Sequence, residues 1–226
     1  MINPLEVIGL VFRKVFGTRN ERMLKVYNRV VDDINPLEVA LRGDYDEAFE
    51  RRAVQIHESD QSEDEREAAL QALRAELSAA LRERATALKE QVRDGEPIAA
   101  VLPEAFALVR EASRRARAHR HFDCQLVGGQ VLYEGKVAEM KTGEGKTIAC
   151  HLAAFLMYLE GKKVHIVTVN DYLVRRDALF ARPIFELLGV TVGYIQSQVD
   201  PGGYQGMRGK EYACVITYGT NNEFGF

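Results

Sequence analysis

Met140-Lys-Thr-Gly-Glu-Gly-Lys-Thr147 is the stretch of sequence that decides the fold of this chain. Gly143 and Gly145 have no Cβ, so the backbone between them can curl until its amides point at one centre, and a helix that begins near Lys146 would add the positive end of its dipole. The Lys146 side chain would reach the β- and γ-phosphates of a nucleotide, and the Thr147 hydroxyl would be a ligand of Mg²⁺. The stretch therefore predicts a phosphate-binding loop in which Thr142 and Glu144 also contact the nucleotide.

The loop departs from the general pattern at one position, because Met140 stands where a first glycine is expected. This weakens the match to kinases and small GTPases, whereas Thr-Gly-x-Gly-Lys-Thr is typical of helicase-like motors. A glycine-rich surface loop that arose by chance is the alternative. The flanking pattern argues against it, since 136–140 predicts a short strand and 146–160 a largely apolar helix that ends at Gly161.

Downstream of the loop the apolar pattern changes from helical to strand-like. The β-branched run 164–169 predicts a strand buried on both faces of a parallel sheet, and 190–195 and 212–218 predict two more strands. Asn170-Asp171 is expected to cap the helix between the first two strands, which ends at Gly189. Glycines and a proline at 201–206 indicate a loop. Alternating strands and helices predict the α/β class, here part of the parallel sheet of a RecA-like P-loop NTPase.

Upstream of the loop the chain is predicted to be helical throughout. Thr18 with Glu21 and Ser62 with Glu65 form capping boxes, and the second helix carries a leucine stripe that ends at Asp94-Gly95. Other expected boundaries are a first helix that ends at Gly17, a new cap at Asn35-Pro36, a break at Gly43 and a helix start at Pro103. We therefore expect a helical region at 1–118 and the first part of a nucleotide-binding domain at 119–226.

Phe122 and Gln125 lie at a suitable distance before the loop to read a base. The planar amide of Gln125 offers one donor and one acceptor, which match the exocyclic amine and a ring nitrogen of adenine, and Phe122 could cover the base. Taken alone, such a glutamine is more often a buried polar group bonded within the protein. Because a phosphate-binding loop follows, we prefer adenine recognition and hence ATP over GTP.

Composition excludes a few classes of protein. The 30 basic and 33 acidic residues give a formal net charge of −3, which rules out a uniformly basic protein held to nucleic acid by bulk charge. The three cysteines are widely spaced, so no disulfide framework or zinc site is expected. No signal peptide or membrane-spanning run is expected either. The arginines at 110–120 are interpreted as a solvated helix face in preference to a nucleic-acid patch.

Several segments resemble SecA, the bacterial protein-translocation ATPase. They are Arg120-His-Phe-Asp-Cys-Gln125, Gly128-Gly129, the stretch 138–147, Val167-Thr-Val-Asn-Asp-Tyr-Leu173, Arg176-Asp-Ala178 and Ile216-Thr-Tyr-Gly-Thr-Asn-Asn-Glu-Phe-Gly-Phe226, with weaker likeness at 15–20 and 102–112. Three departures stand out: region 43–95 matches poorly and is acidic, His119 replaces an apolar residue, and the chain stops at Phe226. In that family the carboxylates that hold Mg²⁺ and a second motor lobe would follow this point.

The resemblance implies a function for the whole protein. It would bind ATP and Mg²⁺ between two lobes and hydrolyse ATP to drive secretory preproteins through the SecYEG channel. It would be cytoplasmic and peripheral on the inner face of the cell membrane, where Arg13, Lys14, Arg19, Arg22 and Lys25 suit an anionic surface. A secretion chaperone and a second copy of the chain are further partners compatible with it, whereas nucleic acid is not. A helicase of superfamily 2 and a non-hydrolysing adaptor are the alternatives.

Overall fold

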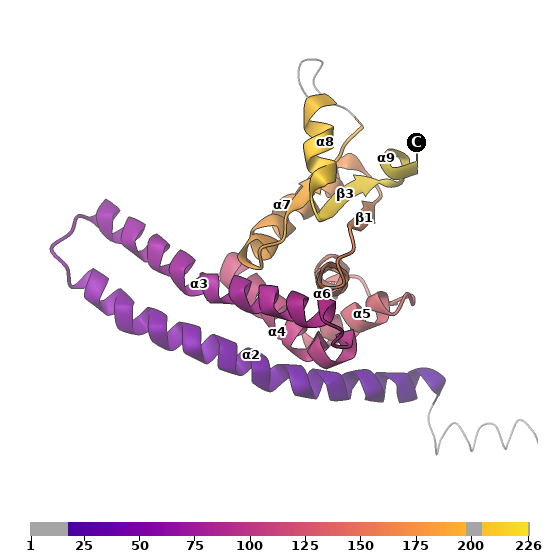
Figure 1. Cartoon of the computed structure of the whole chain (residues 1–226), viewed down its shortest axis with the longest axis horizontal. Coiled ribbons are helices and arrows are strands. Elements are labelled where there is room, and N and C mark those ends of the chain that lie inside the picture. Colours follow the sequence, from indigo (N-terminus) through magenta and orange to yellow (C-terminus); the bar gives the residue numbers. More distant parts are fainter. Residues whose placement is uncertain (1–17, 198–204, 226) are drawn as a thin grey trace, which may run out of the picture.

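The computed structural model describes residues 18–197 and 205–225, so the helix expected before Gly17, with Arg13 and Lys14, and the expected loop at 201–203 lie outside the described residues. The amino-terminal half is helical, with α2 Arg19–His57, α3 Glu63–Arg93, α4 Ile98–Arg117 and α5 Asp123–Tyr133. Figure 1 shows α2 and α3 as a long hairpin whose tip projects away from the rest of the molecule. No helix among the described residues is long and apolar enough to cross a membrane.

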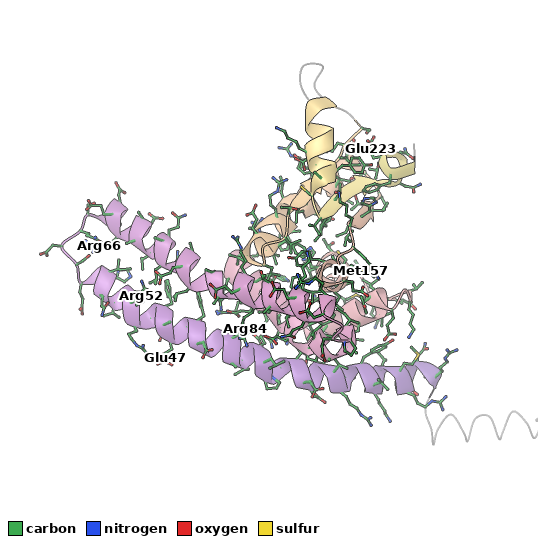
Figure 2. All side chains as sticks on the ribbon, viewed as in Figure 1. Glu47, Arg52, Arg66, Arg84, Met157 and Glu223 are labelled. Carbon is green, nitrogen blue, oxygen red and sulfur yellow. The ribbon has the colours of Figure 1, made fainter. Side chains whose placement is uncertain are left out.

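Both expected capping boxes are confirmed. The Thr18 side chain accepts from the Glu21 amide at the start of α2, and Ser62 accepts from the Glu65 amide at the start of α3. Ion pairs also connect neighbouring helices: Arg52 on α2 pairs with Glu76 on α3 at 2.6 Å, and Arg84 on α3 pairs with Glu104 on α4 at 3.1 Å. Figure 2 shows where Arg52 and Arg84 lie on α2 and α3. These pairs are exposed and each stabilises the fold only slightly.

Three of the expected helix boundaries are wrong. α2 runs without interruption through Asn35-Pro36 and Gly43, and α4 begins at Ile98, so Pro103 lies inside it. A proline in a helix removes one backbone hydrogen bond, and packing can outweigh that loss. Here α2 buries one face along most of its length, with Tyr27, Val31, Ile34 and Leu41 each at most 6% exposed. Burial of this face keeps the helix continuous through Pro36 and Gly43.

The carboxyl-terminal half alternates helices and strands. The elements are α6 Lys146–Leu159, β1 Val164–Thr168, α7 Asp171–Leu187, β2 Val192–Tyr194, α8 Gln205–Ala213, β3 Ile216–Thr220 and α9 Asn221–Gly225. The strands form one parallel sheet in the order β1-β3-β2, with Val164 and Val192 both opposite Ile216. Asn170 caps α7 by accepting from the Leu173 amide at 2.9 Å. The predicted α/β class is therefore confirmed.

Three expectations about the strands are wrong. Residues 136–140 form no strand among the described residues, and Val137 is 93% exposed. A strand needs a neighbour for its backbone hydrogen bonds, and none of the described strands pairs with this segment. β1 is not buried on both faces, because His165 and Val167, which share one face, are exposed, with Val167 at 55%. In addition, Tyr212 belongs to α8 and Gly206 lies in the same helix, so the last strand starts only at Ile216.

The interpretation of the arginines at 110–120 as a solvated helix face is wrong for Arg110 and Arg115, whereas Arg117 and Arg120 are exposed as expected. Arg110 is fully buried, and the Arg115 side chain is 6% exposed. Carboxylates neutralise both, since Arg110 pairs with Asp123 and Arg115 pairs with the buried Glu111. The more exposed Arg120 pairs with the buried Glu38. A solvated arginine face and a buried, paired one have the same charge pattern along α4. The sequence therefore could not show that acidic residues on α2 would come to lie beside it.

One hydrophobic core joins the two halves. It includes Val31 on α2, Phe106 on α4, Phe155 on α6, Phe185 on α7 and Ile216 on β3, all 3% exposed or less. The division at 118 into two regions stays a prediction. What the core establishes is that the helices before the loop pack directly against the helices that follow it.

Candidate phosphate-binding site

The loop before α6 has the backbone conformation that its glycines were expected to give it. Gly143 and Gly145 adopt positive φ values of 89° and 79°, which residues with a Cβ rarely adopt. Gly145 is the N-cap of α6, and no side chain caps this helix. The carbonyl of Gly145 accepts from the amides of Ile148 and Ala149, so the amides before them point out of the helix end without a side-chain acceptor. This geometry fits a phosphate group.

The polar side chains of the loop bond to the loop itself. The Lys146 Nζ atom donates to the Lys141 carbonyl at 2.8 Å, and a Glu144 carboxylate oxygen accepts from the Lys141 amide at 2.7 Å. Lys146 and Thr142 are exposed, and Thr147 is half-buried in the first turn of α6. The structure thus brings Thr142, Lys146 and Thr147 to one helix end, and it places the Glu144 carboxylate beside them.

Gln125 lies beneath the loop. It is 3% exposed; its Oε1 atom accepts from the Phe122 amide at 2.9 Å, and its Nε2 atom donates to the Glu144 carbonyl at 2.8 Å. Phe122 is 65% exposed. The structure shows the alternative noted above, a buried glutamine bonded within the protein. Adenine recognition by Gln125 stays a prediction, and it would require at least one of these bonds to open.

The contact between Gln125 and the loop is so close that it restricts residue 145. A Cβ on Gly145 would lie 2.2 Å from the Gln125 Nε2 atom. Gly145→Ala is therefore expected to lower the free energy of unfolding by about 1–2 kcal/mol, because alanine disfavours the left-handed conformation, and to displace Gln125 as well. Urea unfolding checks this result against Gly143→Ala, which has a similar φ but no atom within 4 Å of its Cβ. Equal losses of unfolding free energy in both variants would show that the contact with Gln125 does not contribute to the effect of Gly145→Ala.

Magnesium would have few protein ligands here. Among the described residues no group of three His, Cys, Asp or Glu side chains could hold a metal ion. The Thr147 hydroxyl is the expected ligand, and the remaining ligands would be phosphate oxygens and water, as is usual for Mg²⁺ bound with a nucleotide. The chemistry of the donors therefore fits a metal that arrives with its nucleotide.

Sequence reasoning missed a cavity of about 790 Å³ beside the loop. It lies between α2, α5 and the segment 136–140, and Tyr27, Val127, Met140 and Glu144 are among its lining residues. At its edge the Tyr27 hydroxyl donates to Glu134 at 2.5 Å, and Lys136 contacts both. The cavity shares Glu144 with the phosphate-binding loop, so the two sites are neighbours. Only the tertiary packing of α2 creates it.

Comparison with known proteins identifies the family. Residues 64–226 match the model of the SecA DEAD-like domain. Proteins named protein translocase subunit SecA from Neisseria meningitidis and Coxiella burnetii are both 45% identical to this chain, over 96% and 97% of its length, and one from Cellvibrio japonicus is 44% identical over 97%. These spans include most of region 43–95, the region expected from the sequence to match the family poorly. That DEAD-like domain implies a RecA-like helicase fold.

The chain is much shorter than these relatives. It spans about a fifth of their length, 20% in each case. The match nevertheless covers most of this chain, including the phosphate-binding loop, the segment that carries Gln125 and all three strands. This chain therefore belongs to the SecA family.

Proposed function

We propose that this chain is the ATP-binding portion of a protein-translocating motor ATPase. The observation that carries the proposal is the uncapped start of α6 at Gly145, followed directly by Lys146 and Thr147. Backbone amides at a helix start attract phosphate, and a lysine and a threonine there add a cation and a Mg²⁺ ligand. Phe122, Gln125, Thr142, Gly143, Glu144 and Gly145 complete the proposed nucleotide site.

For the whole protein we propose the activity named in its relatives, protein translocation. ATP hydrolysis would drive secretory preproteins through the SecYEG channel from the cytoplasmic face of the membrane. Support comes from the name of the relatives and from their identity to this chain. The anionic membrane surface, a secretion chaperone and a second copy of the chain are proposed as further partners. Arg19, Arg22 and Lys25, at the start of α2, are exposed and available to such a surface.

For these 226 residues by themselves we propose weak nucleotide binding without hydrolysis. Hydrolysis needs a group that orients the attacking water and carboxylates that hold the metal. Thr147 is the expected metal ligand, and no acidic cluster suited to a metal occurs among the described residues. A magnesium-dependent release of phosphate by the pure chain, above that of Lys146→Ala, would contradict this part of the proposal.

Lys146→Ala is expected to weaken ADP binding by at least tenfold. The reason is that hydrogen bonds to charged groups are stronger than neutral ones, at about 1.5–3 kcal/mol each. Isothermal titration calorimetry with ADP and Mg²⁺ measures the affinity. Lys162→Ala is the matched control, because Lys162 is an exposed lysine after α6 that pairs with Glu160. Equal affinity in wild type and Lys146→Ala would exclude the phosphate site.

Gln125→Ala separates recognition of adenine from phosphate binding. If Gln125 reads adenine, this variant should lose preference for ADP over GDP, whereas Lys146→Ala should weaken both nucleotides equally. An unchanged preference in Gln125→Ala would limit the role of this residue to the two internal hydrogen bonds seen in the structure.

A nucleic-acid helicase is the second candidate, and the structure gives it little support. Most arginines that could have formed a basic patch are paired with carboxylates, Arg114 with Asp46, Arg115 with Glu111 and Arg120 with Glu38. The relatives are named as translocase subunits. ATPase activity of the full-length protein that is stimulated by single-stranded RNA but not by anionic vesicles would favour the helicase.

A further inference from the structure

We propose that Arg110 is a positioning residue of the nucleotide site, which fixes the segment carrying Gln125 against α2. The inference rests on the site proposed above, and it assigns a role to a buried cation that the phosphate-binding loop does not include. Arg110 lies in the middle of α4 and is 0% exposed. A buried guanidinium needs hydrogen-bond acceptors in fixed places, so it determines where those acceptors lie.

The guanidinium of Arg110 joins three elements. Its Nε atom donates to the His121 carbonyl at 2.7 Å, and its two terminal nitrogens donate to Asn35 on α2 at 2.7 Å and to Asp123 on α5 at 2.8 Å. Asn35 and Asp123 are far apart in sequence, and neither contact was predicted from it. Burial lowers the pKa of Arg110, and the hydrogen bond that Arg110 donates to Asp123 opposes that shift.

A second arginine holds the same segment from its other side. Arg120 donates to both carboxylate oxygens of Glu38, at 2.8–3.2 Å, and Glu38 is 1% exposed on α2. A paired interaction of this kind fixes direction as well as distance. Residues 120–123 are therefore attached to one face of α2 at both ends, through Glu38 and through Arg110.

From this segment the connection continues to the phosphate-binding loop. Gln125 accepts from the Phe122 amide, one residue from His121 and Asp123, and donates to the carbonyl of Glu144. Gly145, the next residue, starts α6. A shift of 120–123 would therefore move the Gln125 amide and loosen the loop. An alternative is that Arg110 only stabilises the packing of α4 on α2, in which case its loss would affect the whole fold equally.

Amide hydrogen exchange in the nucleotide-free chain separates these two roles. Arg110→Met removes the three hydrogen bonds while keeping a side chain of similar length. We expect the Phe122 and Glu144 amides to exchange about five- to tenfold faster, since each depends on the position of Gln125 or of the loop, and one net hydrogen bond corresponds to about 1 kcal/mol.

Arg115→Met is the matched control. Arg115 lies on the same helix, is nearly as buried, and bonds to Glu111 and to the carbonyls of Leu77 and Leu41, away from the loop. It should leave exchange at Phe122 and Glu144 unchanged. Equal acceleration in Arg110→Met and Arg115→Met, or none in Arg110→Met, would overturn the proposal.

Asp123→Ala keeps the proposal testable if Arg110→Met does not fold. The Asp123 side chain is 59% exposed, so its removal should cost little stability while it takes one acceptor from Arg110. We expect faster exchange at the Phe122 amide and a reduced preference for ADP over GDP. Adding Asp123→Ala to Gln125→Ala should have no further effect on that preference, because both changes act through one amide.

The outcomes also separate this inference from the proposed function. If wild type binds no nucleotide while Arg110→Met still accelerates exchange at Glu144, the nucleotide site fails and the positioning of the loop stands. If wild type binds ADP and exchange at Phe122 and Glu144 is unchanged in both Arg110→Met and Asp123→Ala, the inference fails and the site stands. Additive losses of preference in the double variant would also count against it.

Discussion

Glu111→Leu is expected to lower the free energy of unfolding by about 3–5 kcal/mol, because it leaves a buried arginine without its partner. Glu111 is fully buried on α4 and accepts from Arg115 at 2.6 Å and from Arg114 at 2.8 Å. The Arg115 side chain is 6% exposed, so water cannot replace the lost carboxylate. The expected loss is a large share of the stability of an ordinary domain.

Urea unfolding followed by circular dichroism measures this effect. The double variant Glu111→Leu with Arg115→Met should recover most of the loss, since replacing both members of a buried ion pair by apolar residues is often nearly neutral. Glu47→Leu is the control, because Glu47 also pairs with an arginine, Arg51, but both side chains are exposed. Additive losses in the double variant would show that the pair is not coupled.

Stability is expected to fall by roughly 4 kcal/mol between pH 7 and pH 5, because two buried histidines must stay neutral in the folded chain. Burial lowers the pKa of His121 to about 4 and that of His151 to about 3, from an unfolded value of 6.5. Below pH 6.5 the unfolded chain therefore binds protons that the folded chain does not. Stability is present above pH 6.5 and decreases as the pH falls.

The surroundings of the two rings explain their preference for the neutral form. Among the described residues, neither ring nitrogen of His151 has a hydrogen-bond partner, and His121 uses only Nε2, at 3.1 Å from the Ile148 carbonyl. Phe180 and Phe185 pack against the His151 ring, and the positive charges of Arg110 and Arg120 further lower the pKa of His121.

Thermal melts between pH 8 and pH 4.5 test the prediction. His151→Leu should be less sensitive to acid than wild type by about half, because one of the two histidines is removed. His57→Gln, at the exposed end of α2, should follow the wild-type profile. A His151→Leu profile parallel to that of wild type would contradict the prediction, because it would show that His151 binds protons equally in the folded and unfolded chain.

Local rules account for the parts of the fold that the sequence predicted well. The capping boxes at Thr18 and Ser62, the Asn170 cap and the start of α6 all depend on residues within four positions of each other. The parallel sheet followed from β-branched runs separated by helices. The wrong boundaries lie at Pro36, Gly43 and Pro103, where burial of a helix face outweighs a local preference.

The candidate site was predictable in part. Gly143, Gly145, Lys146 and Thr147 follow one another in the chain, so their convergence at a helix start needs only local geometry. The state of Gln125 was not predictable, because it depends on how closely α5 packs beneath the loop. The same holds for the arginines, whose partners on α2 are between 68 and 82 residues away.

The sequence by itself predicted the glycine loop at the start of α6, the α/β class and the family, because each depends on short, contiguous motifs. Only the tertiary structure decided that α2 runs unbroken, that 136–140 is not a strand, and that Arg110 and Arg115 of α4 are buried and paired. The physical reason is that the free-energy cost of burying a charge, or of placing a proline in a helix, depends little on the neighbouring sequence. Whether that cost is offset depends on partners that only the folded chain brings within reach.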